Sequence, residues 1–124
     1  MTKKNEKNSY FLVQEESENY AHIILANIFS EPKVTAEIFE ISTQMILEKN
    51  KNIVIDLRDN VYVGKSMLAF LINLDCHLRE KNQSLILMSL RNRVHALLEW
   101  FNLENTIKHI RSVDQIPVAF NNPS

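Results

Sequence analysis

Residues 52–74, NIVIDLRDNVYVGKSMLAFLINL, constrain the fold of this chain more than any other stretch. The stretch begins with residues 53–57, an apolar run that indicates a strand buried on both faces. A short polar turn follows, and an amphipathic helix begins directly after Gly64, the only glycine in the protein. Such a connection places backbone N–H groups and small side chains at the positive end of the helix. We therefore expect the functional site at residues 64–67.

Apolar strands and amphipathic helices alternate along the rest of the chain. Strands are predicted at residues 10–14, 20–29, 53–57, 84–88 and 106–110. Three helices are predicted, one starting between residues 32 and 36 and ending near 48–52, one after Gly64, and one around 94–101. The order β-β-α-β-α-β-α-β predicts an α/β fold with a mixed, mostly parallel central sheet of about five strands and helices packed against it. The first strand is expected to be the antiparallel partner.

The first two helices are predicted to turn defined faces towards the sheet. In the first helix the apolar residues recur at steps of four, three and four, at Val34, Ile38, Ile41 and Met45. In the second helix they form one stripe, at Met67, Phe70, Leu71, Leu74 and Leu78. We expect both sets of side chains to be buried.

Length and composition predict a single small domain. A chain of 124 residues can bury roughly two-thirds of its unfolded surface, which is enough for one core. We expect a disordered tail at residues 1–9, one domain at 10–117 and a loose tail at 118–124. Because the net charge is −1, from 14 basic and 15 acidic residues, neither nucleic acid nor an anionic membrane is the expected partner.

The expected location is the cytoplasm. No stretch approaches the ~20 apolar residues that span a bilayer, so membrane insertion is not expected. The N-terminus has no apolar segment of the kind that a secretory signal contains. Cys76 is the only cysteine and cannot form an internal disulfide.

Residues for catalysis or metal binding do not converge in the sequence. A single glycine excludes the glycine-rich phosphate loops, and none of the four histidines pairs with another at the i, i+4 spacing of a helical zinc site. Asp75, Cys76 and His77 are consecutive, but neighbours on a helix point about 100° apart. We therefore expect no catalytic residues, no metal, no cofactor and no enzymatic activity.

Two further residues allow more than one interpretation. Asp56 lies near the C-terminal end of a predicted buried strand, where open α/β sheets carry their sites. The favoured alternative is that its carboxylate braces the following turn with Asp59 and Asn60. Trp100 is either an exposed anchor for a partner or, as we favour, a cover for the edge of the core.

Three segments together resemble a STAS domain, the family of anti-sigma-factor antagonists and sulfate-transporter cytoplasmic domains. They are NIVIDLRDNVYVGKSMLAFLINL, LREKNQSLILMSL and RNRVHALLEWFNLENTI, and the resemblance extends over residues 10–115. It implies the STAS-like α/β fold. The family motif D-S-[ST]-G falls on residues 64–67. Its aspartate is Gly64 here, its phosphorylated serine is Lys65, its second hydroxyl residue is kept as Ser66, and its glycine is Met67; a later family glycine is Asn102.

The resemblance implies a role in bacterial signalling. In the family, an anti-sigma factor that is also a kinase phosphorylates the motif serine at the helix N-terminus. The unphosphorylated antagonist binds that kinase and frees the sigma factor, so the family regulates transcription by partner switching. Lys65 cannot accept phosphate from such a kinase, and its charge is opposite to that of phosphoserine. The resemblance therefore implies a non-catalytic protein-binding module without the usual phosphorylation switch.

The predicted partner is an anti-sigma factor or a related serine kinase or ATPase. The residues predicted to bind it lie in two turns and at the start of the second helix: Ser30, Glu31, Asp59, Gly64, Lys65, Ser66 and Met67. Two alternatives stay open. In one, Ser66 is the phosphoacceptor instead of the N-cap of the second helix. In the other, the chain is a STAS accessory module of a transport or lipid-trafficking system.

Overall fold

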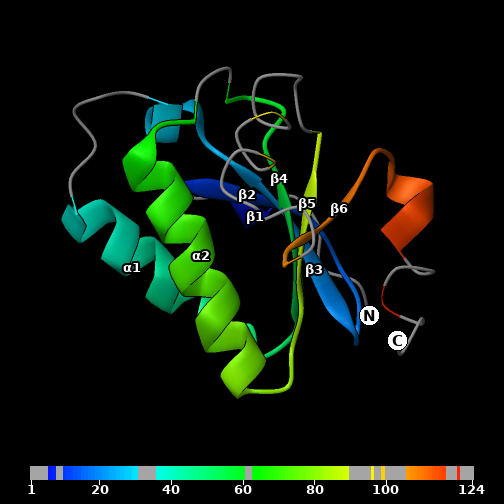
Figure 1. Ribbon diagram of the computed structural model, residues 1–124. Coiled ribbons are helices and arrows are strands. Elements are labelled where there is room, and N and C mark those ends of the chain that lie inside the picture. The colour runs from blue at the N-terminus through cyan, green and yellow to red at the C-terminus, as the bar shows by residue number, and fades with distance from the viewer. Residues whose placement is uncertain are drawn as a thin grey trace.

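The structure is a computed structural model that describes residues 6–7, 10–30, 36–60, 63–89, 96, 99, 106–116 and 120. Its strands are β1 (Glu6–Lys7), β2 (Phe11–Glu16), β3 (Tyr20–Leu25), β4 (Asn52–Asp56), β5 (Leu85–Met88) and β6 (Lys108–Ile110). Its helices are α1 (Ala36–Leu47) and α2 (Lys65–Glu80), with short 3-10 turns η1 (Asn27–Ser30) and η2 (Val113–Gln115). Figure 1 shows α1 and α2 side by side over one face of the sheet, with η2 (orange) on the other side.

The strands form one mixed sheet in the order β1-β2-β3-β4-β5-β6. Strands β1, β2 and β3 pair antiparallel, and β3, β4, β5 and β6 pair parallel. This confirms the predicted α/β class and the antiparallel first hairpin. The five predicted strands are all present, and the two-residue strand β1 adds an edge that the sequence placed in the N-terminal tail.

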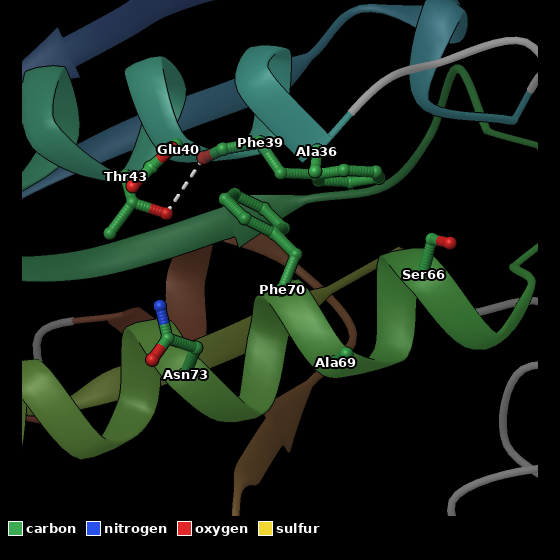
Figure 2. A pocket seen from close by; sticks show the side chains of 8 residues that line it. All are labelled: Ala36, Phe39, Glu40, Thr43, Ser66, Ala69, Phe70 and Asn73. Atoms are coloured by element: carbon green, nitrogen blue, oxygen red, sulfur yellow. Dashed lines mark hydrogen bonds between the residues drawn. The ribbon is translucent and has the colours of Figure 1, made fainter.

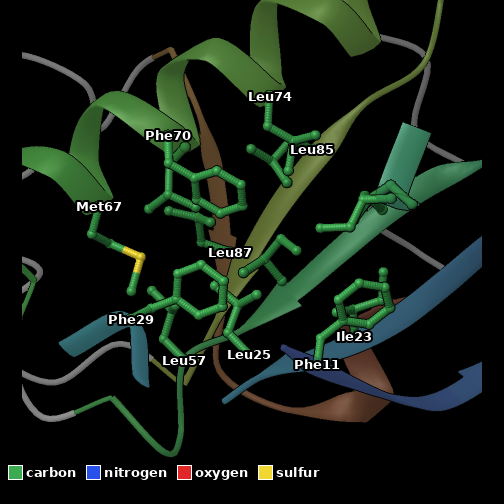
Figure 3. Close-up of a cluster of buried hydrophobic side chains, with 14 of the residues drawn as sticks. Phe11, Ile23, Leu25, Phe29, Leu57, Met67, Phe70, Leu74, Leu85 and Leu87 are labelled. Atoms are coloured by element: carbon green, nitrogen blue, oxygen red, sulfur yellow. The ribbon is translucent and has the colours of Figure 1, made fainter. Parts of the chain in front are cut away.

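The central strands are buried on both faces, as their apolar runs predicted. One face of β3, β4 and β5 packs under the helices, where Leu25, Leu57 and Leu87 meet the α2 side chains Met67 and Phe70 (Figure 3). The other face carries a smaller cluster of buried residues: Val54, Ile86, Met88, Ile110 and Ile116. Phe120 stacks on Tyr20 beside this cluster, with ring centroids 5.8 Å apart.

Asparagine takes the conformation that glycine most often supplies after a helix. Asn50 follows α1 with φ 53° and Asn82 follows α2 with φ 59°. Asparagine tolerates this left-handed region better than most residues, because its short polar side chain can hydrogen-bond locally. Gly64, by contrast, has φ −93° and precedes α2.

Helix α1 confirms its predicted face only in part: Ile38 and Met45 are half-buried and pack against the core, but the buried face is displaced towards Ser42 and Thr43. Ile41, expected in the core, is 38% exposed, whereas Ser42 and Thr43 are buried. The Ser42 hydroxyl donates to the carbonyl of Ile38 at 2.7 Å, and that of Thr43 donates to the carbonyl of Phe39 at 2.8 Å. Because these bonds satisfy the hydroxyl groups within the helix, small polar residues can occupy the inner face. Val34 lies outside the described residues.

Helix α2 confirms the predicted stripe. All five of its predicted core residues are buried: Met67, Phe70, Leu71, Leu74 and Leu78. The three consecutive residues Asp75, Cys76 and His77 do not share one environment, as expected. Asp75 is buried, whereas Cys76 and His77 are exposed. Oδ2 of Asp75 forms an ion pair with Nε of Arg79, one turn later, at 2.9 Å.

Several predictions lie outside the described residues. They include most of the predicted third helix, with Trp100 and Asn102. The division into tail, domain and C-terminal tail remains a prediction.

Candidate functional site

The connection from β4 to α2 begins with a turn that is tied to the sheet. The turn residues Arg58 and Asp59 are exposed, whereas Asn60 is fully buried. The side-chain amide of Asn60 donates to the carbonyl of Leu25 on the neighbouring strand β3 at 3.2 Å. This bond satisfies a buried polar group and fixes the direction in which the chain leaves the sheet.

Asp56, the last residue of β4, anchors the same turn. Its Oδ1 accepts the backbone N–H of Arg58 at 3.0 Å. Its Oδ2 accepts from the guanidinium of Arg58 at 3.0 and 2.6 Å and from Nε2 of His22 at 2.9 Å. The carboxylate therefore braces the turn, as the favoured interpretation held, but its partners are Arg58 and His22 instead of Asp59 and Asn60.

The hydrogen bonds keep the Asp56 carboxyl ionised. Burial by itself would raise its pKa, but bonds from His22, Arg58 and Ser89 outweigh that effect. The net result is a pKa well below the usual value of an aspartate. Because the ionised carboxylate can only accept, Nε2 of His22 carries the hydrogen in this pair.

His22 is the residue of this cluster that sequence reasoning missed. It is 1% exposed and lies in β3 opposite Val54, while Asp56 lies opposite Ile24, two residues further along. The signal in the sequence is a lone histidine inside an apolar strand. Its partner could not be named, because 34 residues separate the two and only the parallel register brings them together.

The first turn of α2 presents the central residues of the predicted site. Gly64 is the N-cap and makes no side-chain capping bond, so Ser66 is not the N-cap that one interpretation expected. Lys65 and Ser66 are exposed as the first two residues of the helix. Met67 is 1% exposed and belongs to the core, which corrects its assignment as a partner-binding side chain.

The other predicted binding turn lies beside this helix. Phe29 in η1 stacks on Phe70 in α2, with ring centroids 5.6 Å apart and an angle of 17° between the rings. Ser30 is the last residue of η1. Glu31 lies outside the described residues.

A groove between α1 and α2 extends the site in a way the sequence did not indicate. It has a volume of about 350 Å³. Its lining residues come from the two helices: Ala36, Phe39, Glu40 and Thr43 from α1, and Ser66, Ala69, Phe70 and Asn73 from α2. Figure 2 shows the rings of Phe39 and Phe70 meeting between the helices, with Ser66 near the start of α2. Detecting it requires the relative position of two helices, which no local pattern records.

The described residues hold no group of three or more histidine, cysteine, aspartate or glutamate side chains placed to bind a metal ion. Among the same residues, no helix is long and apolar enough to cross a membrane.

Comparison with known proteins adds a family and a fold. A sequence model of the STAS domain matches residues 15–116. No curated protein matches the chain.

Solved structures share the fold at low sequence identity. The crystal structure of a proposed anti-sigma factor antagonist from Thermotoga maritima has a TM-score of 0.63 and 16% identity, covering 82% of this chain and 88% of that one. An anti-sigma-factor antagonist (STAS) domain protein from Planctomyces limnophilus has a TM-score of 0.66 and 14% identity, with coverages of 83% and 92%. An NMR structure of the Thermotoga protein has a TM-score of 0.71 and 12% identity, and the match covers 86% of this chain and 86% of that one. At these identities the likeness concerns the fold.

Proposed function

The chain belongs to the STAS domain family, and we propose that it is a non-catalytic protein-binding module of the anti-sigma-factor-antagonist type. Its partner is an anti-sigma factor or a related serine kinase or ATPase. The observation that carries the proposal is the exposure of Lys65 and Ser66 on the first turn of α2. These are the motif positions at which the resemblance places the phosphorylated serine and the second hydroxyl residue of antagonists.

The docking surface comprises the turn after β4, the N-terminus of α2 and the end of η1. Its residues are Asp59, Gly64, Lys65 and Ser66, with Ser30 at the end of η1. Glu31, which is also predicted to bind the partner, lies outside the described residues. Three contacts support a rigid surface. The Asp56 carboxylate and the Asn60 amide tie down the turn after β4, and the stacking of Phe29 on Phe70 holds η1 against α2.

The module lacks the usual switch at its motif position. A Ser/Thr kinase transfers phosphate to a hydroxyl group, and Lys65 has none. Its positive charge also cannot imitate a phosphate, which carries about two negative charges at neutral pH. On this proposal the protein remains in the binding-competent form, whatever the kinase activity of its partner.

A second candidate is an antagonist that is phosphorylated on Ser66. The observation that favours it is that Ser66 is exposed at the second position of α2, where it does not serve as the N-cap. A phosphate there would lie at the positive end of the helix and next to Lys65, and both would stabilise its charge.

One experiment separates the two candidates. The chain is incubated with an anti-sigma-type ATPase from the same organism and with ATP, and its intact mass and its affinity for the ATPase are measured. Binding without a phosphate gain supports the module without a switch. A gain of one phosphate that disappears in Ser66→Ala rejects it in favour of the second candidate. If the chain binds no such ATPase, both candidates fail and the transport-accessory alternative gains support.

Lys65→Ser is the matched variant for this experiment. If it becomes phosphorylated while wild type does not, the docking surface is intact and only the acceptor hydroxyl is missing.

A further inference from the structure

The groove between α1 and α2 has an apolar floor and small residues at its sides. Phe39 and Phe70 approach with ring centroids 5.3 Å apart and an angle of 42° between the rings. Phe70 is buried, whereas Phe39 remains partly exposed. Ala36 and Ala69 are two of the exposed lining residues, and their short side chains contribute to the open volume of about 350 Å³ between the helices. The groove therefore offers one apolar side chain a place to be buried.

The charge of the groove is negative. Glu40 lines it, and the other seven lining residues are uncharged. Helix α1 carries Glu37 and Glu40 and has no lysine, arginine or histidine. Glu40 is exposed, and no described cation lines the groove beside it. A ligand that combines an apolar group with a positive charge complements this surface.

The groove is also continuous with the proposed docking surface. Ser66 belongs to both, because it lies on the first turn of α2 and lines the groove (Figure 2). A protein bound at the α2 N-terminus would therefore reach the groove with an adjacent segment. This continuity favours a segment of the same partner over a separate small molecule.

We propose that the groove receives a segment of the protein partner in which one apolar side chain, seated over Phe39 and Phe70, stands beside a lysine or arginine that pairs with Glu40. The inference rests on the proposed function and extends its docking surface to α1. The apolar side chain supplies affinity and the basic side chain supplies selectivity.

The test measures the affinity of an anti-sigma-type ATPase from the same organism for the wild-type chain and four variants by isothermal titration calorimetry. Ala69→Leu fills the groove, and Glu40→Lys reverses its charge. Cys76→Leu adds bulk at an exposed position of α2 outside the groove, and Glu48→Lys makes the same charge change just beyond α1. Circular dichroism checks that all four variants are folded.

We expect Ala69→Leu and Glu40→Lys each to raise Kd at least about tenfold, which corresponds to the loss of one central contact. The two control variants should stay within about twofold of wild type. The loss of affinity in Glu40→Lys should become smaller as the NaCl concentration is raised, because salt screens exposed charges. The loss of affinity in Ala69→Leu should not depend on salt.

Other results overturn the inference in distinguishable ways. If wild type binds but both groove variants bind equally well, the groove is not used, and the proposed function stands. If only Ala69→Leu weakens binding, the segment is not cationic and the proposal is wrong in its chemistry. If the groove variants change only self-association, measured by light scattering, the occupant is a second copy. If wild type binds no such ATPase, the proposed function itself fails, and the inference with it.

Discussion

Nε2 of His22 lies 2.9 Å from Oδ2 of Asp56, although the two residues are 34 positions apart in the chain. Both side chains are almost fully buried, at 1% and 0% exposure. The pair joins β3 to the end of β4, and Arg58 extends it to the surface, where its own side chain is 46% exposed. This cluster holds the turn that leads towards α2.

Removal of the Asp56 carboxylate should destabilise the protein strongly. Asp56→Ala leaves the His22 N–H without its acceptor in a buried position and releases the backbone N–H of Arg58. We expect the free energy of unfolding to fall by about 3 kcal/mol. Urea denaturation at pH 7 measures the change. Asp59→Ala, at an exposed position of the same turn, is the control and should stay within about 0.5 kcal/mol of wild type.

The same carboxylate should make the free energy of unfolding depend on pH in the acidic range. Because the pKa of Asp56 in the folded protein lies below the unfolded value of about 3.9, its contribution is fully present above that unfolded value. It is lost as the pH falls towards the folded pKa. We expect the free energy of unfolding to decline from about pH 5 to pH 2, and to decline less in Asp56→Asn. Parallel curves for the two proteins would show that other groups cause the decline.

A charge reversal at the start of α2 should stabilise the helix. Lys65 is the first residue of α2, and the first turn has no acidic residue, so a positive charge faces the positive end of the helix dipole. We expect Lys65→Glu to raise the free energy of unfolding by about 0.5–1 kcal/mol at low ionic strength. Thermal unfolding at two salt concentrations provides the measurement. Lys65→Gln should give an intermediate value, and an unchanged gain in high salt would argue against an electrostatic cause.

Gly64 should be replaceable without backbone strain. Its φ of −93° and ψ of −174° are extended values that any residue adopts, and it makes no side-chain capping bond. Gly64→Ser should therefore stabilise the protein by about 0.5 kcal/mol, through a new cap and a less flexible unfolded chain. Chemical denaturation tests this. A clear loss of stability would mean that the small size of Gly64 is needed for packing.

The corrected face of α1 leads to opposite expectations for two isoleucines. Ile41 is 38% exposed and Ile46 is fully buried. Ile41→Lys should change the free energy of unfolding by less than about 0.5 kcal/mol, whereas Ile46→Ala should lower it by about 2–5 kcal/mol. If instead the exposed position were the costly one, the helix would face the sheet as the sequence pattern suggested.

Local patterns predicted the elements that depend on local rules. The α2 stripe from Met67 to Leu78 was predicted correctly because its apolar residues recur at an uninterrupted helical period. The same rule was only partly right for α1: Ile38 and Met45 pack against the core, but Ile41 is exposed. Ser42 and Thr43 satisfy their hydroxyl groups on their own helix and can therefore be buried beside Ile46. Hydrophobic periodicity cannot register a polar side chain that is satisfied internally.

The amino-acid sequence alone determined the α/β class and the strand–turn–helix connection, since each depends on neighbouring residues. Only the tertiary structure decided that His22 meets Asp56, that Met67 is buried beneath the site, and that Phe39 and Phe70 form the floor of a groove. These relationships arise from strand register and from the packing of two helices. Both join residues far apart in the chain, and no local pattern encodes such distances.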